Sequence, residues 1–191
     1  ILLRNLFIKP LYIMVTKKAI LVVFCILSLV ILGCSKVWRT ELDMQRKPYL
    51  GTDLRLDGYY YSTPIKEEEM TIFLFYRNGI SIFFFAGGNN DEDVLKSIEN
   101  RILLNKKVLS TIGSEPHSIG VFQINGKYIE VENFIGRGFR HTYKAYGEII
   151  NDSTIIINDL SGIDGKREAW NIKYKFKKFS PKPDSTSVYI P

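Results

Sequence analysis

The sequence is poor in the residues from which metal centres and disulfide-rich scaffolds are built. Its 191 residues include only two cysteines and two histidines. Two cysteines form at most one disulfide, which excludes a fold that several disulfides stabilise. His117 and His141 lie far apart in the sequence, with no cluster of Cys, His or carboxylate ligands beside them. We therefore expect no metal site.

Motifs that carry catalysis or bind cofactors are also missing. The chain has no Gly-x-Ser-x-Gly motif, no phosphate-binding loop and no dinucleotide fingerprint. We therefore expect no catalytic residues, no cofactor and no enzymatic activity.

Acidic residues are absent from the first 33 positions, which contain four basic ones. Subtracting these four charges from the formal net charge of +6 leaves +2 for residues 34–191. A nearly neutral domain lacks the electrostatic footprint of a nucleic-acid-binding protein. The lysines near the C-terminus alternate with aromatic residues that face the other way, so they indicate a solvated strand face. We expect no nucleic-acid partner.

No apolar run reaches the roughly 20 residues that a membrane-spanning helix needs. The longest, Ala19 to Leu32, has 14 residues and follows Lys17 and Lys18. As a helix it would be about 21 Å long. A basic start followed by an apolar stretch of this length is typical of an export signal. We assign residues 14–33 to a signal peptide that forms a hydrophobic helix, and residues 1–13 to an upstream extension or a longer signal sequence.

Ile31-Leu32-Gly33-Cys34 resembles the lipobox of bacterial lipoproteins. The resemblance implies cleavage after Gly33 and attachment of lipid to Cys34. The acyl chains of this lipid, such as palmitate, would hold the protein on a membrane. It places the mature protein at the cell membrane or the outer membrane, facing the periplasm. The alternative is an uncleaved anchor helix in which Cys34 has no role.

The remaining chain predicts one all-β domain, residues 54–179, between a tether at 34–53 and a disordered Pro/Ser tail at 180–191. Pro and Gly interrupt both flanking segments. Apolar segments bounded by turn residues predict eight strands, at 54–62, 70–77, 80–85, 118–124, 127–135, 141–150, 154–160 and 168–179.

Three short turns connect these strands in pairs. Asn78-Gly79 and Asn125-Gly126 predict two-residue type I′ turns, and the second places Phe122 opposite Ile129. Asn151 to Ser153 predicts a looser third turn. Sequential antiparallel strands close most economically as an up-and-down barrel, which leaves no free edge.

One amphipathic helix is predicted at 91–104, after the third strand. Its apolar face consists of Val94, Leu95, Ile98 and Ile102. The hairpin before it is apolar on both faces, and we assign Phe73, Phe75, Ile80, Ile82 and Phe84 to one of them. A sheet that is apolar on both faces must be covered on both. We expect the helix to pack outside this hairpin, with a protein partner as the second choice.

Three segments resemble small Gram-negative lipoproteins that are described as lipocalin-like: Leu54–Tyr61, Phe75–Ile80 and Gly120–Gly126. Gly58-Tyr59-Tyr60 is also similar to the Gly-x-Trp of true lipocalins, with Tyr60 in place of Trp. The resemblance covers most of 54–179. It implies an eight-stranded lipocalin-like barrel with an aromatic residue at its floor, and Arg167 is the candidate for the arginine that accompanies that aromatic.

An eight-stranded barrel is wide enough either to fill with side chains or to hold one small ligand. Two functions therefore stay open. One is a membrane-anchored lipoprotein that binds a small apolar or amphipathic ligand. The other is an envelope structural or protein-interaction lipoprotein with a packed, ligand-free barrel. The candidate pocket residues are Tyr60, Phe122, Ile129, Trp170 and Tyr174.

Overall fold

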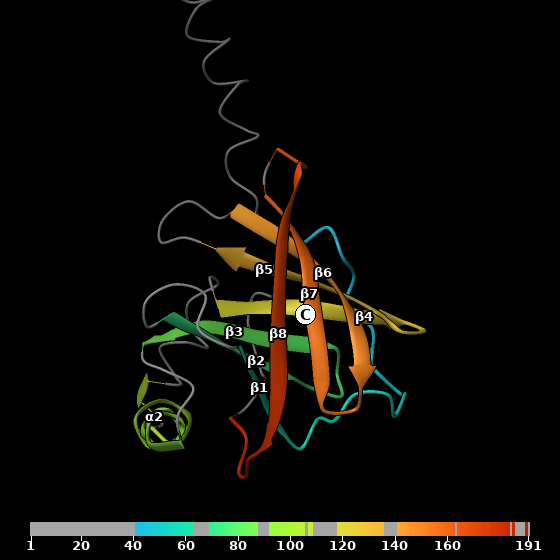
Figure 1. The fold of residues 1–191 in the computed structure, drawn as a ribbon. Helices are drawn as coiled ribbons and strands as arrows, with labels where there is room; N and C mark the ends of the chain where they lie inside the picture. Colours follow the sequence, from blue (N-terminus) through green and yellow to red (C-terminus); the bar gives the residue numbers. More distant parts are fainter. Residues whose placement is uncertain are drawn as a thin grey trace, which may run out of the picture. The chain divides into compact units, whose positions relative to one another are not determined.

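Eight antiparallel strands close into a barrel in their sequence order (Figure 1). The computed structural model describes residues 41–62, 69–87, 92–105, 107–108, 118–135, 141–162, 164–183, 185 and 190. The strands are β1 (Gly58–Ser62), β2 (Glu69–Phe75), β3 (Ile80–Gly87), β4 (Ile119–Asn125), β5 (Tyr128–Ile135), β6 (His141–Asn151), β7 (Thr154–Ser161) and β8 (Arg167–Lys178). The predicted all-β, up-and-down barrel is confirmed. The predicted extension, signal helix, Gly33 and Cys34 lie outside the described residues.

The turn between β2 and β3 differs from the predicted type I′ turn. The Tyr76 N–H donates to the Ile80 carbonyl (3.0 Å), and the Gly79 N–H donates to the Tyr76 carbonyl (2.9 Å). The loop therefore has three residues, and only its last, Gly79, has a positive φ, of 84°. This is the pattern of a type I turn that ends in a glycine bulge.

The extra turn residue exchanges the two faces of β3. Phe83 lies opposite Phe73, and Phe84 lies opposite Ile72. The predicted grouping of Ile80, Ile82 and Phe84 with Phe73 is therefore wrong, because a slip of one residue moves every side chain of a strand to the other face.

The turn between β4 and β5 lies one residue later than predicted, but the two strand faces are not exchanged. Asn125 pairs with Tyr128, so the two turn residues are Gly126 and Lys127. Gly126 has a φ of 58° and Lys127 is not among the residues with positive φ, as in a type II′ turn. Phe122 lies opposite Val131 instead of Ile129. The shift in pairing spans two residues, so the inward face of each strand is the predicted one.

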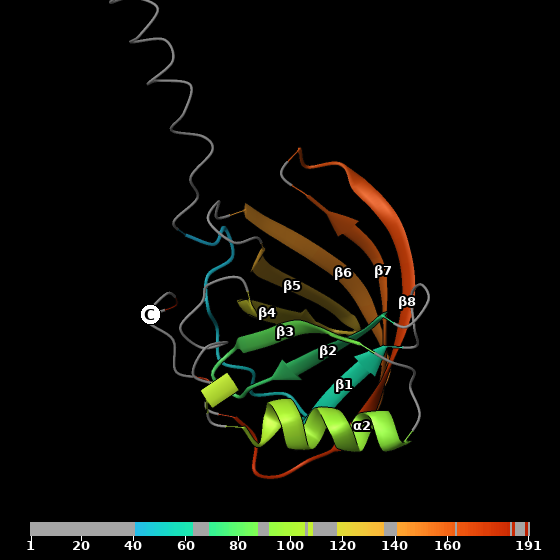
Figure 2. The same cartoon turned by 90° about the vertical axis from the view of Figure 1, so that its left-hand side faces the viewer.

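The predicted helix covers the outside of the first hairpin. It consists of an α-helix, α2 (Glu92–Ile98), that continues as a π-helical turn, η1 (Glu99–Leu103). Figure 2 shows α2 lying along β1 and β2, outside the barrel. Leu95, Ile98 and Leu103 pack on an outer apolar face formed by Tyr59, Met70, Ile72, Leu74, Ile82, Phe84 and Ala86. The predicted placement is confirmed.

Glu99 fixes this helix to two strands. Its carboxylate accepts a hydrogen bond from the Tyr59 hydroxyl (2.8 Å) and pairs with the Lys177 ammonium (2.9 Å). Burial raises the pKa of Tyr59 well above its ordinary value, and the hydrogen bond to Glu99 adds to the shift. Tyr59 therefore stays a neutral donor.

The described parts of both flanking segments pack on the barrel. Leu42, Met44 and Ile190 cover the outer face of β3 and β4, where Ile119 and Val121 are buried. The Met44 N–H donates to a carboxylate oxygen of the buried Glu132 (2.6 Å). Residues 41–53 are thus held along the barrel wall, unlike a tether, and Ile190 is buried within the expected tail. A tether before residue 41 stays a prediction.

Candidate functional site

The barrel interior is filled to different degrees at its two ends. One end, which we call the closed end, holds the β2–β3, β4–β5 and β6–β7 turns and the start of β1. There Tyr60 packs against Phe75 and Phe176, with ring centroids 5.7 and 5.3 Å apart. Phe122 adds a further contact to Phe75, at 4.9 Å. Side chains fill this end.

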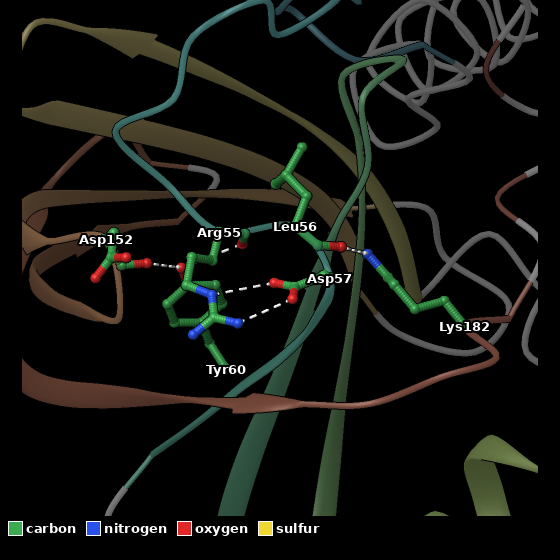
Figure 3. A network of polar contacts seen from close by, with 6 residues as sticks. All are labelled: Arg55, Leu56, Asp57, Tyr60, Asp152 and Lys182. Carbon is green, nitrogen blue, oxygen red and sulfur yellow. Dashed lines mark hydrogen bonds and ion pairs between the residues drawn. The ribbon is translucent and has the colours of Figure 1, made fainter.

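Polar contacts close the same end (Figure 3). The Tyr60 hydroxyl lies 2.7 Å from the Asp152 carbonyl and 3.2 Å from the Arg55 carbonyl. The Arg55 guanidinium makes two hydrogen bonds to Asp57, at 2.8 and 3.1 Å, and its carbon lies 4.2 Å from the centre of the Phe176 ring. The Arg55–Asp57 hydrogen bonds lower the pKa of the Asp57 carboxyl. These contacts join the segment before β1 to the β6–β7 turn.

Lys182 joins the C-terminal segment to the closed end. Its ammonium donates to the carbonyls of Leu56 (2.9 Å) and Phe75 (2.6 Å) and lies 4.0 Å from the centre of the Tyr76 ring. Burial lowers the pKa of Lys182 to about 8, although the Asp57 carboxylate opposes the shift. The arginine beside the aromatic floor is Arg55, whose guanidinium lies over Phe176, a ring that packs on Tyr60. Arg167, the candidate from the sequence, instead lies with its guanidinium carbon 3.8 Å from the centre of the Tyr146 ring.

The opposite end, which we call the open end, contains a cavity of about 310 Å³. Its inner wall is apolar and mostly aromatic, formed by Phe73, Phe83, Tyr143, Ala145, Ile157, Leu160, Trp170 and Tyr174. Its mouth is formed by Phe85, Gly162, Asp164, Lys166 and Glu168, with Phe85 62% exposed. Lys166 and Asp164 lie 4.0 Å apart. The arrangement suits a small molecule that enters with an apolar part first.

A bulge in β7 shapes one wall of this cavity. The register shifts between Ile157 and Asp159 in the pairings with both β6 and β8. As a result Leu160 lines the cavity together with Ile157, although strict alternation would put the two on opposite faces. Asn171, beside the shift on β8, has a φ of 51°, which asparagine tolerates better than most residues.

Two tyrosines bring hydroxyls to the cavity wall, and their environments differ. The Tyr174 hydroxyl shares a hydrogen bond with Thr71 Oγ1 (2.8 Å). Burial raises the pKa of Tyr174 to about 12, against the hydrogen bonds with Thr71 and Trp170. The Tyr143 hydroxyl is buried and has no hydrogen-bond partner among the residues that the structure describes. Burial raises its pKa well above the ordinary value.

The five predicted pocket residues divide between the two ends. Trp170 and Tyr174 line the cavity. Tyr60, Phe122 and Ile129 are buried within the barrel core and are not part of the cavity lining. The sequence interpretation does not include the other lining residues, among them Tyr143 and Leu160. Small Ala145, two residues after Tyr143 on the same inward face, was a readable signal for space beside Tyr143, but the β7 bulge had none.

Other features of the described chain suggest no competing site. A larger hollow, of about 470 Å³, lies between residues 47–53 and 122–126, but its lining mixes apolar side chains with Lys47, Asp53, Gln123 and Asn125. Within the described ranges no cluster of His, Cys, Asp or Glu could hold a metal ion. No helix in that part of the chain is long and apolar enough to cross a bilayer. In comparisons with known proteins, no family model, curated protein or solved structure matches this chain.

Proposed function

We propose that this protein is a membrane-anchored lipoprotein of the cell envelope whose barrel binds one small apolar or amphipathic ligand. The observation that carries the ligand-binding part is the cavity of about 310 Å³ at the open end. Ligand sites in proteins usually measure about 300–1,000 Å³ and are lined mainly by hydrophobic and aromatic side chains. This cavity is at the small end of that range, so its ligand is small.

The distribution of polarity favours an amphipathic ligand over a purely apolar one. The inner wall is formed by rings and aliphatic side chains, whereas three charged residues, Asp164, Lys166 and Glu168, stand at the mouth. An apolar group gains from burial inside, at about 25 cal/mol per Å². A polar end group keeps its hydration at the mouth and reaches both charge signs there. The alternative function, a structural or interaction lipoprotein, expects a packed interior, and only the closed end is packed.

The membrane part of the proposal depends on Cys34 and on the order of basic, apolar and lipobox residues around it. Two or three acyl chains would hold the protein stably, because each buried CH₂ contributes about 0.8 kcal/mol. Replacing Cys34→Ala should abolish palmitate labelling and leave an uncleaved precursor. Continued labelling of the Cys34→Ala chain would refute the anchor.

The test of binding uses residues 35–191, because the barrel and every segment described against it lie within the compact unit Arg39–Pro191. Native mass spectrometry should detect a small copurified molecule, and an apolar fluorescent naphthalene should bind to the emptied barrel. Ala145→Phe should abolish both, because the new ring occupies the cavity. Leu104→Ala, at an exposed position outside the barrel, is the matched control. Binding that persists in Ala145→Phe, with melting unchanged, would place the ligand elsewhere.

A further inference from the structure

The Tyr143 hydroxyl is the one cavity-wall donor that the described residues leave without a partner. Tyr143 is 9% exposed, and its side chain lines the cavity from β6. A buried hydroxyl without a hydrogen bond is costly and rare in folded proteins. Its position therefore needs an explanation that the barrel wall itself does not give.

Neighbouring polar groups offer the Tyr143 hydroxyl no free acceptor. Tyr174 shares its hydroxyl hydrogen bond with Thr71. Asn133 lies opposite Tyr143 on β5, but its side-chain oxygen is 3.5 Å from Ser81 Oγ, and its Nδ2, which is also buried without a partner among the described residues, is a donor. The rings closest in space, such as Phe83 at 5.6 Å, offer no oxygen or nitrogen.

The surroundings of Tyr143 also indicate whether a group that accepts its hydrogen bond can carry a charge. Because burial raises the pKa of Tyr143, the hydroxyl stays protonated and donates at neutral and mildly alkaline pH. The cavity wall around it is apolar, and the charged side chains stand at the mouth. A carboxylate or phosphate at Tyr143 would be buried with no positive partner, which is strongly unfavourable. A ketone, ester or ether oxygen meets no such penalty.

We infer that the ligand carries an uncharged oxygen acceptor within its apolar part, and that the Tyr143 hydroxyl donates a hydrogen bond to that oxygen inside the cavity. The inference rests on the proposed function and adds to it the chemical class of the ligand: a small ketone, ester or ether with apolar groups on both sides of the oxygen.

A matched pair of probes tests this. One is a dimethylaminonaphthalene that carries a propanoyl group, and the other carries a propyl group instead, so that the two differ by one carbonyl oxygen. Both are titrated into residues 35–191 and into the Tyr143→Phe and Tyr174→Phe variants. The propanoyl probe should bind wild type about three- to tenfold more tightly than the propyl probe. In wild type its emission should lie to the red of its emission in Tyr143→Phe, because the excited ketone responds to a hydrogen-bond donor.

Tyr143→Phe should remove the preference and the red shift while the propyl probe binds as before. Tyr174→Phe, whose hydroxyl is already bonded to Thr71, should keep the preference. If both probes bind and Tyr143→Phe changes neither their ratio nor the emission, the acceptor inference is overturned while the proposed binding function stands. If neither probe binds wild type, and native mass spectrometry finds no copurified molecule, both fail.

Discussion

The two ends of the barrel use the same strands and similar aromatic residues, yet one is filled and the other is hollow. At the closed end, Tyr60 packs among other rings and its hydroxyl reaches two carbonyls. At the open end, Tyr143 faces a cavity, and its hydroxyl has no hydrogen-bond partner among the described residues. Two tyrosines that are both buried thus have opposite hydrogen-bonding states. The comparison separates a residue that stabilises the fold from a residue to which we assign a ligand contact.

The largest expected effect comes from emptying the closed end. Tyr60→Ala should lower the free energy of unfolding by about 3–5 kcal/mol, because it leaves a cavity among well-packed rings and removes the hydroxyl that reaches two carbonyls. Trp170→Ala at the open end should cost less than half as much, because that ring is only partly buried and already borders empty space. Urea unfolding of both variants measures the difference. Equal losses would contradict the division into a filled and a hollow end.

Two turn glycines offer the next comparison. Gly79 at the closed end has a φ of 84°, and a Cβ there would lie 2.1 Å from the Lys47 carbonyl. Gly165 at the open end has a φ of 72°, and a Cβ there would meet nothing within 4 Å. Gly165→Ala should therefore cost only the backbone strain, about 1 kcal/mol.

Gly79→Ala should cost about 2–4 kcal/mol, because residues 47–49 must also move away from the turn. Thermal and urea unfolding of the two variants give the comparison. Should Gly165→Ala prove the more damaging change, the segment before β1 would not be held against the closed end as described.

Removing single hydroxyls should have opposite signs at the two ends. Tyr60→Phe should cost about 1–2 kcal/mol, because the hydroxyl that reaches the Asp152 and Arg55 carbonyls is lost and the Asp152 carbonyl keeps only the Arg55 N–H (3.1 Å). Tyr143→Phe in the ligand-free protein should leave stability unchanged or raise it slightly, because an unpaired buried group is lost. Chemical unfolding of ligand-free samples decides this. A clear loss of stability in Tyr143→Phe would show that its hydroxyl already has a partner in the fold.

The smallest expected effect is the pH dependence of the closed end. The folded pKa of Lys182, about 8, lies below its ordinary value of 10.5, so between these values the unfolded chain binds more protons than the folded one. Stability should therefore rise with pH over this interval, by on the order of 1 kcal/mol between pH 8 and 9.5. Lys182→Met should flatten the rise.

Above pH 10 the trend should reverse, because Tyr59, Tyr60, Tyr143 and Tyr174 have folded pKa values above their ordinary value and keep their protons longer when folded. Urea unfolding as a function of pH measures both limbs. A flat profile in wild type between pH 8 and 9.5 would show that the Lys182 ammonium is not buried as described.

Much of this architecture is readable from the sequence, and the exceptions have a common cause. Alternation in β8 correctly predicts that Ile172 and Tyr174 face inward, because burial keeps a period of two there despite the positive φ of Asn171. In β3 a three-residue turn replaces the expected two-residue turn and exchanges the strand faces. In β7 one bulged residue turns Leu160 inward. Single inserted residues leave almost no signal in composition or periodicity, yet each one moves the side chains that follow it in the strand to the opposite face of the sheet.

The candidate site was predicted less completely than the fold for a related reason. Aromatic residues that fill a barrel and those that border a cavity look alike in a sequence, so the sequence alone does not separate Tyr60 and Phe122 from Trp170 and Tyr174. What distinguishes them is the size of the residues opposite, such as Ala145, and the contacts of Arg55 and Lys182 at the closed end.

The docking of residues 41–45 on the barrel wall limits how far the proposed lipid can be from the domain. The chain contacts the wall from Leu42 onward, and the connection from Cys34 to Leu42 can extend to at most about 28 Å. That is about the thickness of a bilayer's hydrocarbon core. With Cys34 lipidated as proposed, this short connecting segment would keep the barrel near the lipid headgroups. A molecule that leaves the lipid phase would then have only a short path to the domain.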